Sequence, residues 1–256
     1  MSNNYFSRAR QLAILVEITI GGSLGGCAVY VPTVPSTPLV QSHEAEITAG
    51  FRGVSSLEAT AAWSPMAHVF FNVEGALQAG KTTRTINSVA TEYDDYHRQV
   101  SFGIGAYTVT KAVRPLYLAA VAGQGFANVD VHPIELFGSF ARYQSNYKRY
   151  YGQLYLAQME EKFSWGLSVR ATWVDYAGLL QDGNPLTVNS RWFAEPHFFI
   201  RGGGGPLQGY ATLGLSMPVV RDAQSPGVGS GVFSPTSVLL GAGLVLRPQL
   251  LKRAGK

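Results

Sequence analysis

Cysteine is almost absent from this chain, because Cys27 is the only one among its 256 residues. A single cysteine excludes an internal disulfide and any metal centre built from cysteine ligands. Charged residues are also scarce, at 14% of the chain, and the net charge of +4 is spread along it without an accompanying aromatic pattern. We therefore expect no nucleic-acid partner. Beyond the N-terminal region, no apolar run approaches the roughly 18 residues that a membrane-spanning helix needs.

Glycine and aromatic side chains are plentiful instead. The chain contains 29 Gly and 13 Pro, and 12% of its residues are aromatic. This composition favours strands joined by turns over helices. From Glu44 onward the dominant hydrophobic period is two, so that alternate side chains face opposite surfaces of a sheet. The body of the protein is predicted to be all-β, and if it lies in a membrane it must cross as strands.

The N-terminus has the order of a secretory signal, in which basic residues, an apolar run and small residues follow one another. Arg8 and Arg10 precede the apolar run at 12–20, and residues 24–27 read Leu-Gly-Gly-Cys. That tetrad resembles the bacterial lipobox, in which cleavage falls before a cysteine that carries the lipid. The resemblance implies a mature, lipid-modified N-terminus at Cys27.

The segment after Cys27 contains three prolines, which disfavour a helix and are typical of a semi-extended linker. Glu17 departs from the signal pattern because it places a charge inside the apolar run, and an ordinary apolar role for Cys27 is the alternative. The expected organisation is a lipoprotein signal peptide at 1–26, a Pro-rich tether at 27–43, a β-barrel at 44–247 and a basic tail at 248–256.

Residues 163–175 show the strand pattern best. Trp165 and Trp173 lie near the two ends of an apolar face whose opposite face is polar. Aromatic residues at both ends of an apolar band, with polar side chains behind it, are typical of a transmembrane β-barrel. The prediction is a closed antiparallel up-and-down barrel of about ten strands, at 45–52, 57–63, 69–77, 100–107, 116–123, 150–160, 163–175, 192–201, 210–217 and 237–246.

The connections between these strands alternate in length. Long loops are expected at 78–96, 124–149, 176–189 and 219–235, with short turns between the other strands. Since bacterial outer-membrane barrels have short periplasmic turns and long outer loops, this pattern places Glu44 and the lipid-bearing N-terminus on the periplasmic side. Two features fit less well: Pro196 should mark a bulge or a local defect in its strand, and the chain does not end at the aromatic residue typical of such barrels.

The inward-facing positions contain charges of both signs. In a barrel of this size the interior is usually filled by side chains, so the charges are expected to pair with one another as a polar plug. A narrow solute or ion path is the alternative function. The expected lumen charge cluster consists of Glu46, Arg52, Glu58, Glu74, Arg170, Glu195, His197 and Arg201.

An enzyme is less expected. Ten-stranded proteases of the omptin type carry an Asp pair and an Asp-x-His pair, and Asp94-Asp95 and Asp130-Val131-His132 invite that comparison. A carboxylate that orients a histidine can activate water. Adjacent aspartates on a strand would point to opposite faces, however. The common nucleophile and metalloprotease motifs are absent, and no catalytic residue, cofactor or metal is expected.

The chain resembles the exported β-barrel proteins, often lipoproteins, of Bacteroidetes-type bacteria. The resemblance rests on the lipobox and the Pro-rich stretch and on the segments 147–153, 167–170 and 193–196, and it extends over most of the chain after Leu24. It implies a location in the outer membrane, with palmitate or a similar acyl chain on Cys27, more than an activity. Outer-membrane lipid is the implied partner. Long outer loops on a rigid scaffold could add a surface ligand or a protein.

Overall fold

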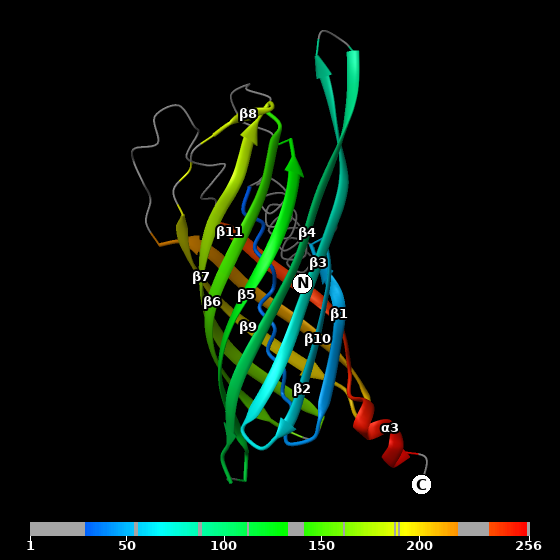
Figure 1. Cartoon of the computed structure of the whole chain (residues 1–256). Coiled ribbons are helices and arrows are strands. Elements are labelled where there is room, and N and C mark those ends of the chain that lie inside the picture. The colour runs from blue at the N-terminus through cyan, green and yellow to red at the C-terminus, as the bar shows by residue number, and fades with distance from the viewer. Residues whose placement is uncertain are drawn as a thin grey trace, which may run out of the picture.

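The structure is a computed structural model that describes residues 29–53, 56–86, 89–111, 113–132, 141–160, 162–186, 188, 190–219 and 236–254. Ten antiparallel strands form a closed up-and-down barrel, and one extra short strand, β8, lies outside the ring (Figure 1). The predicted fold class is confirmed. The strands are β1 (Ala45–Arg52), β2 (Ser56–Met66), β3 (Val69–Ile86), β4 (Val89–Val109), β5 (Leu116–Val131), β6 (Tyr143–Met159), β7 (Phe163–Gln181), β8 (Asn184–Pro185), β9 (Arg191–Gly202), β10 (Leu207–Pro218) and β11 (Ser237–Leu246).

Alternation along each strand produces an inside-out molecule. In β7, Leu167 and Val169 are 49% and 56% exposed on the outer surface. The next residue, Arg170, points to the opposite face and is fully buried in the interior. A water-soluble sandwich would place the apolar set inside. The apolar exterior and the polar interior are instead typical of a barrel that lies in lipid.

The ring closes where β1 pairs with β11 in antiparallel register, with Gly50 opposite Gly243. A Cβ atom on Gly243 would lie 2.2 Å from the Ala49 carbonyl oxygen and 2.7 Å from the Tyr210 ring. Two facing glycines therefore let Tyr210 lie against the seam from the inside.

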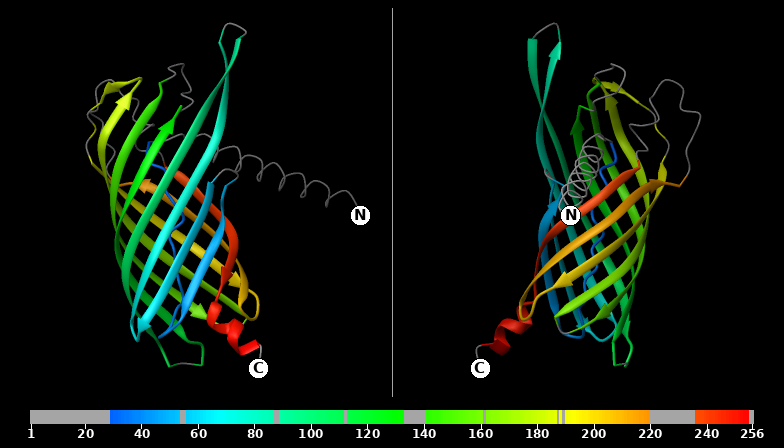
Figure 2. Two further views of the ribbon diagram at one scale, coloured as in Figure 1. Left: turned by 45° about the vertical axis from the view of Figure 1, so that its right-hand side comes forward. Right: turned by 180° about the vertical axis from the view of Figure 1, so that it is seen from behind.

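The strands differ in length around the ring. β3 to β7 contain between 16 and 21 residues, whereas β1, β2, β9, β10 and β11 contain between 8 and 12. One side of the barrel is therefore tall, and β3 with β4 rises highest (Figures 1 and 2). We call the end to which these strands extend the long-hairpin end and the opposite end the short-turn end.

Three of the four segments predicted to be long loops contain strands instead. The segment 78–96 is a continuation of the β3–β4 ladder, which runs on to the Ile86–Val89 pair. The segment 124–149 contains the paired ends of β5 and β6, and 176–189 contains the end of β7 and β8. The 78–96 segment is rich in polar residues, so it lacks the apolar alternation that marks a strand in lipid. In the other two segments inward residues such as Val129 and Leu179 are buried, but they lie beyond the regular apolar outer face. The fourth predicted loop lies mostly outside the described residues.

Pro196 interrupts a ladder without shifting it. It pairs with Val169 of β7, while β10 keeps one register on both sides of it, from Gly214–His197 to Met217–Ala194. Since proline has no N–H to donate, it leaves a gap on the β10 side. The result is a local defect and no bulge.

The expected basic tail begins as a short helix, α3 (Pro248–Ala254), at the short-turn end. The Gln249 side-chain oxygen accepts a hydrogen bond from the Ala45 amide, which joins this helix to the start of β1. Among the described residues, no helix is long and apolar enough to cross a bilayer.

The segment expected to tether the barrel to a lipid is inside the barrel. Residues 29–40, which we call the strap, run through the lumen, and residues 41–43 are exposed where the chain turns into β1 (Figure 2). Tyr30 and Leu39 near its two ends are each only 1% exposed. The prediction of a linker outside the barrel is therefore wrong for these residues, because their backbone polar groups bond to the lumen wall instead of to water.

The seam gives a first test. Gly243→Val should destabilise the closed barrel by about 1–3 kcal/mol, because the new side chain collides with backbone and with Tyr210. The measurement is the temperature at which the compact, heat-modifiable gel band is lost. Gly152→Val is the matched control: an added Cβ there meets nothing within 4 Å. Equal band stability for the two variants would contradict the role of the seam glycines.

Candidate functional site

The strap crosses the lumen from one end to the other. At the long-hairpin end the Tyr30 ring lies 4.3 Å from the Phe193 ring and 5.9 Å from the Tyr147 ring, measured between centroids. At the short-turn end Leu39 and Val40 are buried among tyrosines that include Tyr117. The strap therefore occupies the space through which a solute would have to pass.

Wall carboxylates accept hydrogen bonds from the strap backbone. The amides of Val34, Ser36 and Leu39 donate to side chains of Glu58, Glu74 and Glu46 at 3.0, 3.3 and 3.4 Å, respectively. Each of these glutamates belongs to the predicted charge cluster. A buried backbone amide needs such a partner, because leaving it unpaired costs about 1–3 kcal/mol.

The strap carbonyls are matched by donors from the opposite wall. Gln153 donates to the Ser36 carbonyl at 2.7 Å, Tyr155 to the Pro38 carbonyl at 2.7 Å and Tyr117 to the Val40 carbonyl at 3.0 Å. Arg201 donates to the carbonyl of Thr37. Acceptors on β1 to β3 and donors on β5, β6 and β9 thus hold the strap from both sides.

The densest charge group lies at mid-height. Glu74 accepts hydrogen bonds from Arg149 at 2.8 Å and from Arg170 at 2.5 Å, and both guanidinium groups are completely buried. The Arg170 guanidinium also lies 4.4 Å from the centroid of the Tyr151 ring. One carboxylate therefore compensates two cations and also accepts a hydrogen bond from the strap amide of Ser36.

The other predicted cluster residues form separate groups. Arg52 pairs with Glu58 at 2.8 Å, and Arg201 pairs with Glu46 at 2.8 Å near the short-turn end. Glu195 forms no such ion pair with any residue that the structure describes. It accepts hydrogen bonds from Tyr30, Thr172 and Ser216 at 2.7, 2.9 and 3.2 Å. Through Tyr30 it holds the start of the strap.

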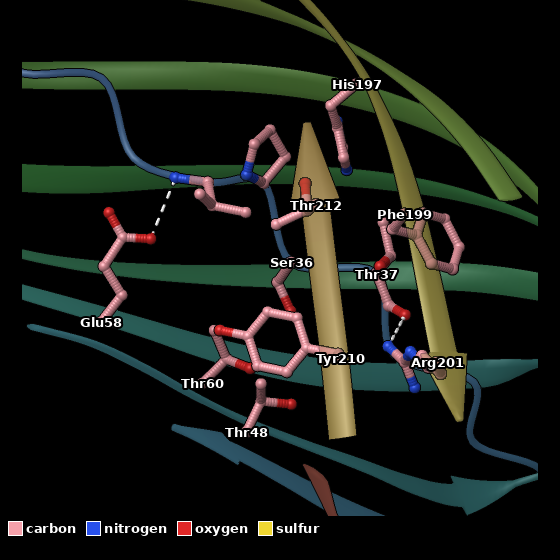
Figure 3. A pocket seen from close by; sticks show the side chains of 12 residues that line it. Ser36, Thr37, Thr48, Glu58, Thr60, His197, Phe199, Arg201, Tyr210 and Thr212 are labelled. Carbon is pink, nitrogen blue, oxygen red and sulfur yellow. Dashed lines mark hydrogen bonds between the residues drawn. The ribbon is translucent and has the colours of Figure 1, made fainter. Parts of the chain in front are cut away.

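His197, the eighth residue of the predicted cluster, lies against a cavity of ≈ 40 Å³ beside the strap (Figure 3). Thr48, Thr60, Tyr210 and Thr212 also line it. The Thr212 hydroxyl has no hydrogen-bond partner among the described residues. A polar cavity of this size has room for a water molecule or two, and it is too small for a solute.

Sequence reasoning missed Arg149, because it was assigned to a loop that precedes the sixth expected strand. The signal was present: Tyr143, Tyr147, Tyr151 and Tyr155 recur at every fourth residue and are all buried on one face of β6. Arg149 has the same parity and therefore faces the lumen. The strap contacts carried no comparable signal, because most of them join residues far apart in the chain, such as Ser36 and Gln153.

The residues that suggested a protease are only partly brought together. His132 Nδ1 lies 2.9 Å from an Asp95 carboxylate oxygen at the long-hairpin end. Asp94 is exposed on the other face of β4, and Asp130 is bound by Arg142, whose pKa is raised by these hydrogen bonds. Of the four residues compared with an omptin-type site, only Asp95 and His132 therefore meet.

Within the described part of the chain, no three His, Cys, Asp or Glu side chains could hold a metal ion together. Cys27 lies outside the described residues. Comparison with protein-family models, with curated proteins and with solved structures finds no match.

Glu74 provides a second test. Among the described residues, Glu74 is the only carboxylate that bonds Arg149 and Arg170. Glu74→Leu should therefore destabilise the barrel by about 3–5 kcal/mol, the usual cost of an uncompensated buried charge. Urea unfolding in detergent micelles measures the change.

The matched control is Glu92→Gln, which removes one partner of the Lys81–Glu92 ion pair, whose side chains are 66% and 62% exposed. Its effect should stay below about 1 kcal/mol. If Glu74→Leu were as mild, the mid-height charge group would not stabilise the fold.

Proposed function

We propose that this protein is an outer-membrane β-barrel lipoprotein whose own strap closes the lumen and whose long hairpins serve a structural or surface-interaction role. The observation that carries the proposal is the strap itself, held inside the barrel by wall carboxylates and tyrosines. The proposal assigns no catalytic activity and no cofactor.

The outer surface supports insertion in a membrane. Apolar side chains such as Leu154, at 66% exposed, and Val169 cover the outside of the ring. Trp173 stacks on Trp192 at 6.0 Å and lies 5.9 Å from Tyr150, which forms an outward aromatic group toward the long-hairpin end. Trp165 lies eight residues earlier on β7, about 20 Å away along the barrel axis for a tilted strand. That spacing suits an apolar band of about 25 Å between two aromatic girdles.

The lumen supports a closed barrel over the alternative of a narrow pore. Barrels of about eight strands have interiors just wide enough for side chains to fill. Here the interior contains the strap in addition to the wall side chains, and the cavity beside the strap is ≈ 40 Å³. Permeation would require the strap to leave the lumen and its hydrogen bonds to be broken.

The long-hairpin end supports a surface role. β3 and β4 continue beyond their neighbours as a two-stranded ribbon that carries exposed charges, including Lys81 and Glu92. Neither β2 nor β5 accompanies them along this stretch. Polar ribbons on a rigid scaffold are suited to contact a surface ligand or another protein, and outer-membrane lipid surrounds the barrel below them.

Planar-bilayer recordings test the closed lumen. The full chain should insert without steady channel currents, whereas a variant that lacks residues 31–38 should conduct, because its lumen loses the strap. Heat-modifiable gel mobility shows in parallel that the shortened chain still forms a closed barrel. Steady currents from the full chain would contradict the proposal and favour the pore.

A further inference from the structure

The strap has a direction as well as a location. Val29 is buried in a cluster with Val131, Ala141 and Tyr143, which lie where β5 ends and β6 begins at the long-hairpin end. Val40 lies at the opposite end, where its carbonyl accepts a hydrogen bond from Tyr117 near the start of β5. The chain therefore enters the lumen at the long-hairpin end and descends to the short-turn end.

The turns identify the two ends relative to a membrane. At the short-turn end the connections are brief, as between Met66 and Val69 in the β2–β3 turn and between Met159 and Phe163 in the β6–β7 turn. Short turns of outer-membrane barrels face the periplasm and long hairpins face outward. Val29 then lies on the outer side, although β1 begins on the periplasmic side.

We infer that the chain passes through its own barrel to the cell surface, so that a lipid on Cys27 inserts in the outer leaflet. This inference rests on the proposed function. Only Ala28 separates Cys27 from Val29, and the two Cα–Cα steps between them span at most about 7 Å. The strap from Tyr30 to Val40 covers roughly 30 Å when extended. An acyl chain attached at Cys27 therefore cannot reach the periplasmic leaflet while the strap occupies the lumen.

This inference differs from the expectation that the lipid-bearing N-terminus lies on the periplasmic side. That expectation took the position of Glu44 as the position of the N-terminus, which is valid only for a tether outside the barrel. With the strap inside, β1 starts at one end and the preceding residues leave from the other.

The route also imposes an order of assembly. The strap is held by hydrogen bonds to both walls, from Glu74 on β3 to Gln153 on β6. An acylated N-terminus has no space to slide past such contacts in a closed ring. The strap is therefore laid against the open sheet before β1 pairs with β11.

Three epitope insertions test the route in intact cells, each made in the full chain. The first follows Ala28. The second follows Gly183 in the β7–β8 turn at the long-hairpin end, and the third follows Gly203 in the β9–β10 turn at the short-turn end. Both glycines have positive φ values in exposed turns, where insertions are best tolerated. Heat-modifiable mobility shows that each tagged chain forms the closed barrel.

Antibody should label the Ala28 and Gly183 tags on intact cells, and the Gly203 tag only after the outer membrane is permeabilised. If the Ala28 tag required permeabilisation while the Gly183 tag did not, the inference would be overturned and the proposed membrane barrel would stand. If the Gly183 tag were hidden or the Gly203 tag exposed, the proposed orientation itself would fail, and the inference with it.

The anchor is tested separately in the Ala28-tagged chain. Cys27→Ser should remove incorporation of labelled palmitate. Surface labelling should persist, because the strap rather than the lipid determines where the chain emerges. Persistent palmitate incorporation in the Cys27→Ser variant would overturn the lipid part of the inference.

Discussion

Glu74 accepts hydrogen bonds from Arg149, from Arg170 and from the backbone amide of Ser36, and the other interior contacts are arranged around this point. A carboxylate in a dry interior is costly unless cations and donors surround it, and each buried guanidinium needs a carboxylate in turn. The strap shares this requirement, because its buried amides need acceptors as well. The wall charges and the strap therefore satisfy one another, and neither set would be stable in the lumen alone.

The same requirement explains how the two sides of the lumen differ. The β5–β6 side presents tyrosine and glutamine donors, whereas β1, β2 and β3 present glutamates. Three prolines reduce the number of strap amides that need acceptors. A polypeptide with few donors and a regular row of carbonyls is therefore well suited to lie between a wall of acceptors and a wall of donors.

Much of the fold could be predicted because the apolar band around the outside of the barrel follows a strict pattern. Within it, outward residues such as Val169 are apolar and inward residues such as Arg170 are polar, so a period of two reveals both the strand and its faces. Above the band both faces of β3 and β4 meet water, the pattern disappears, and strands were taken for loops. The inward glutamates could be predicted from parity alone, whereas their partners could not, because pairings such as Glu74 with Arg149 depend on closure of the whole ring.

The strap was beyond sequence reasoning for a different reason. A Pro-rich polar segment is equally suited to an exposed linker and to a lumen filling, and only its long-range contacts distinguish the two. Pro196 shows the reverse case: a residue that should disturb its strand is accommodated because one neighbouring strand tolerates a missing donor.

The uneven strand lengths give the barrel a slanted rim, high over β3 to β7 and low over β9 to β2. A barrel with a level rim presents the same height on every side, whereas this barrel has one high side and one low side. A molecule that approaches from the low side of the rim reaches the mouth of the barrel and the strap. One that approaches from the high side meets a wall of paired strands, so neighbours can be distinguished by the direction from which they arrive.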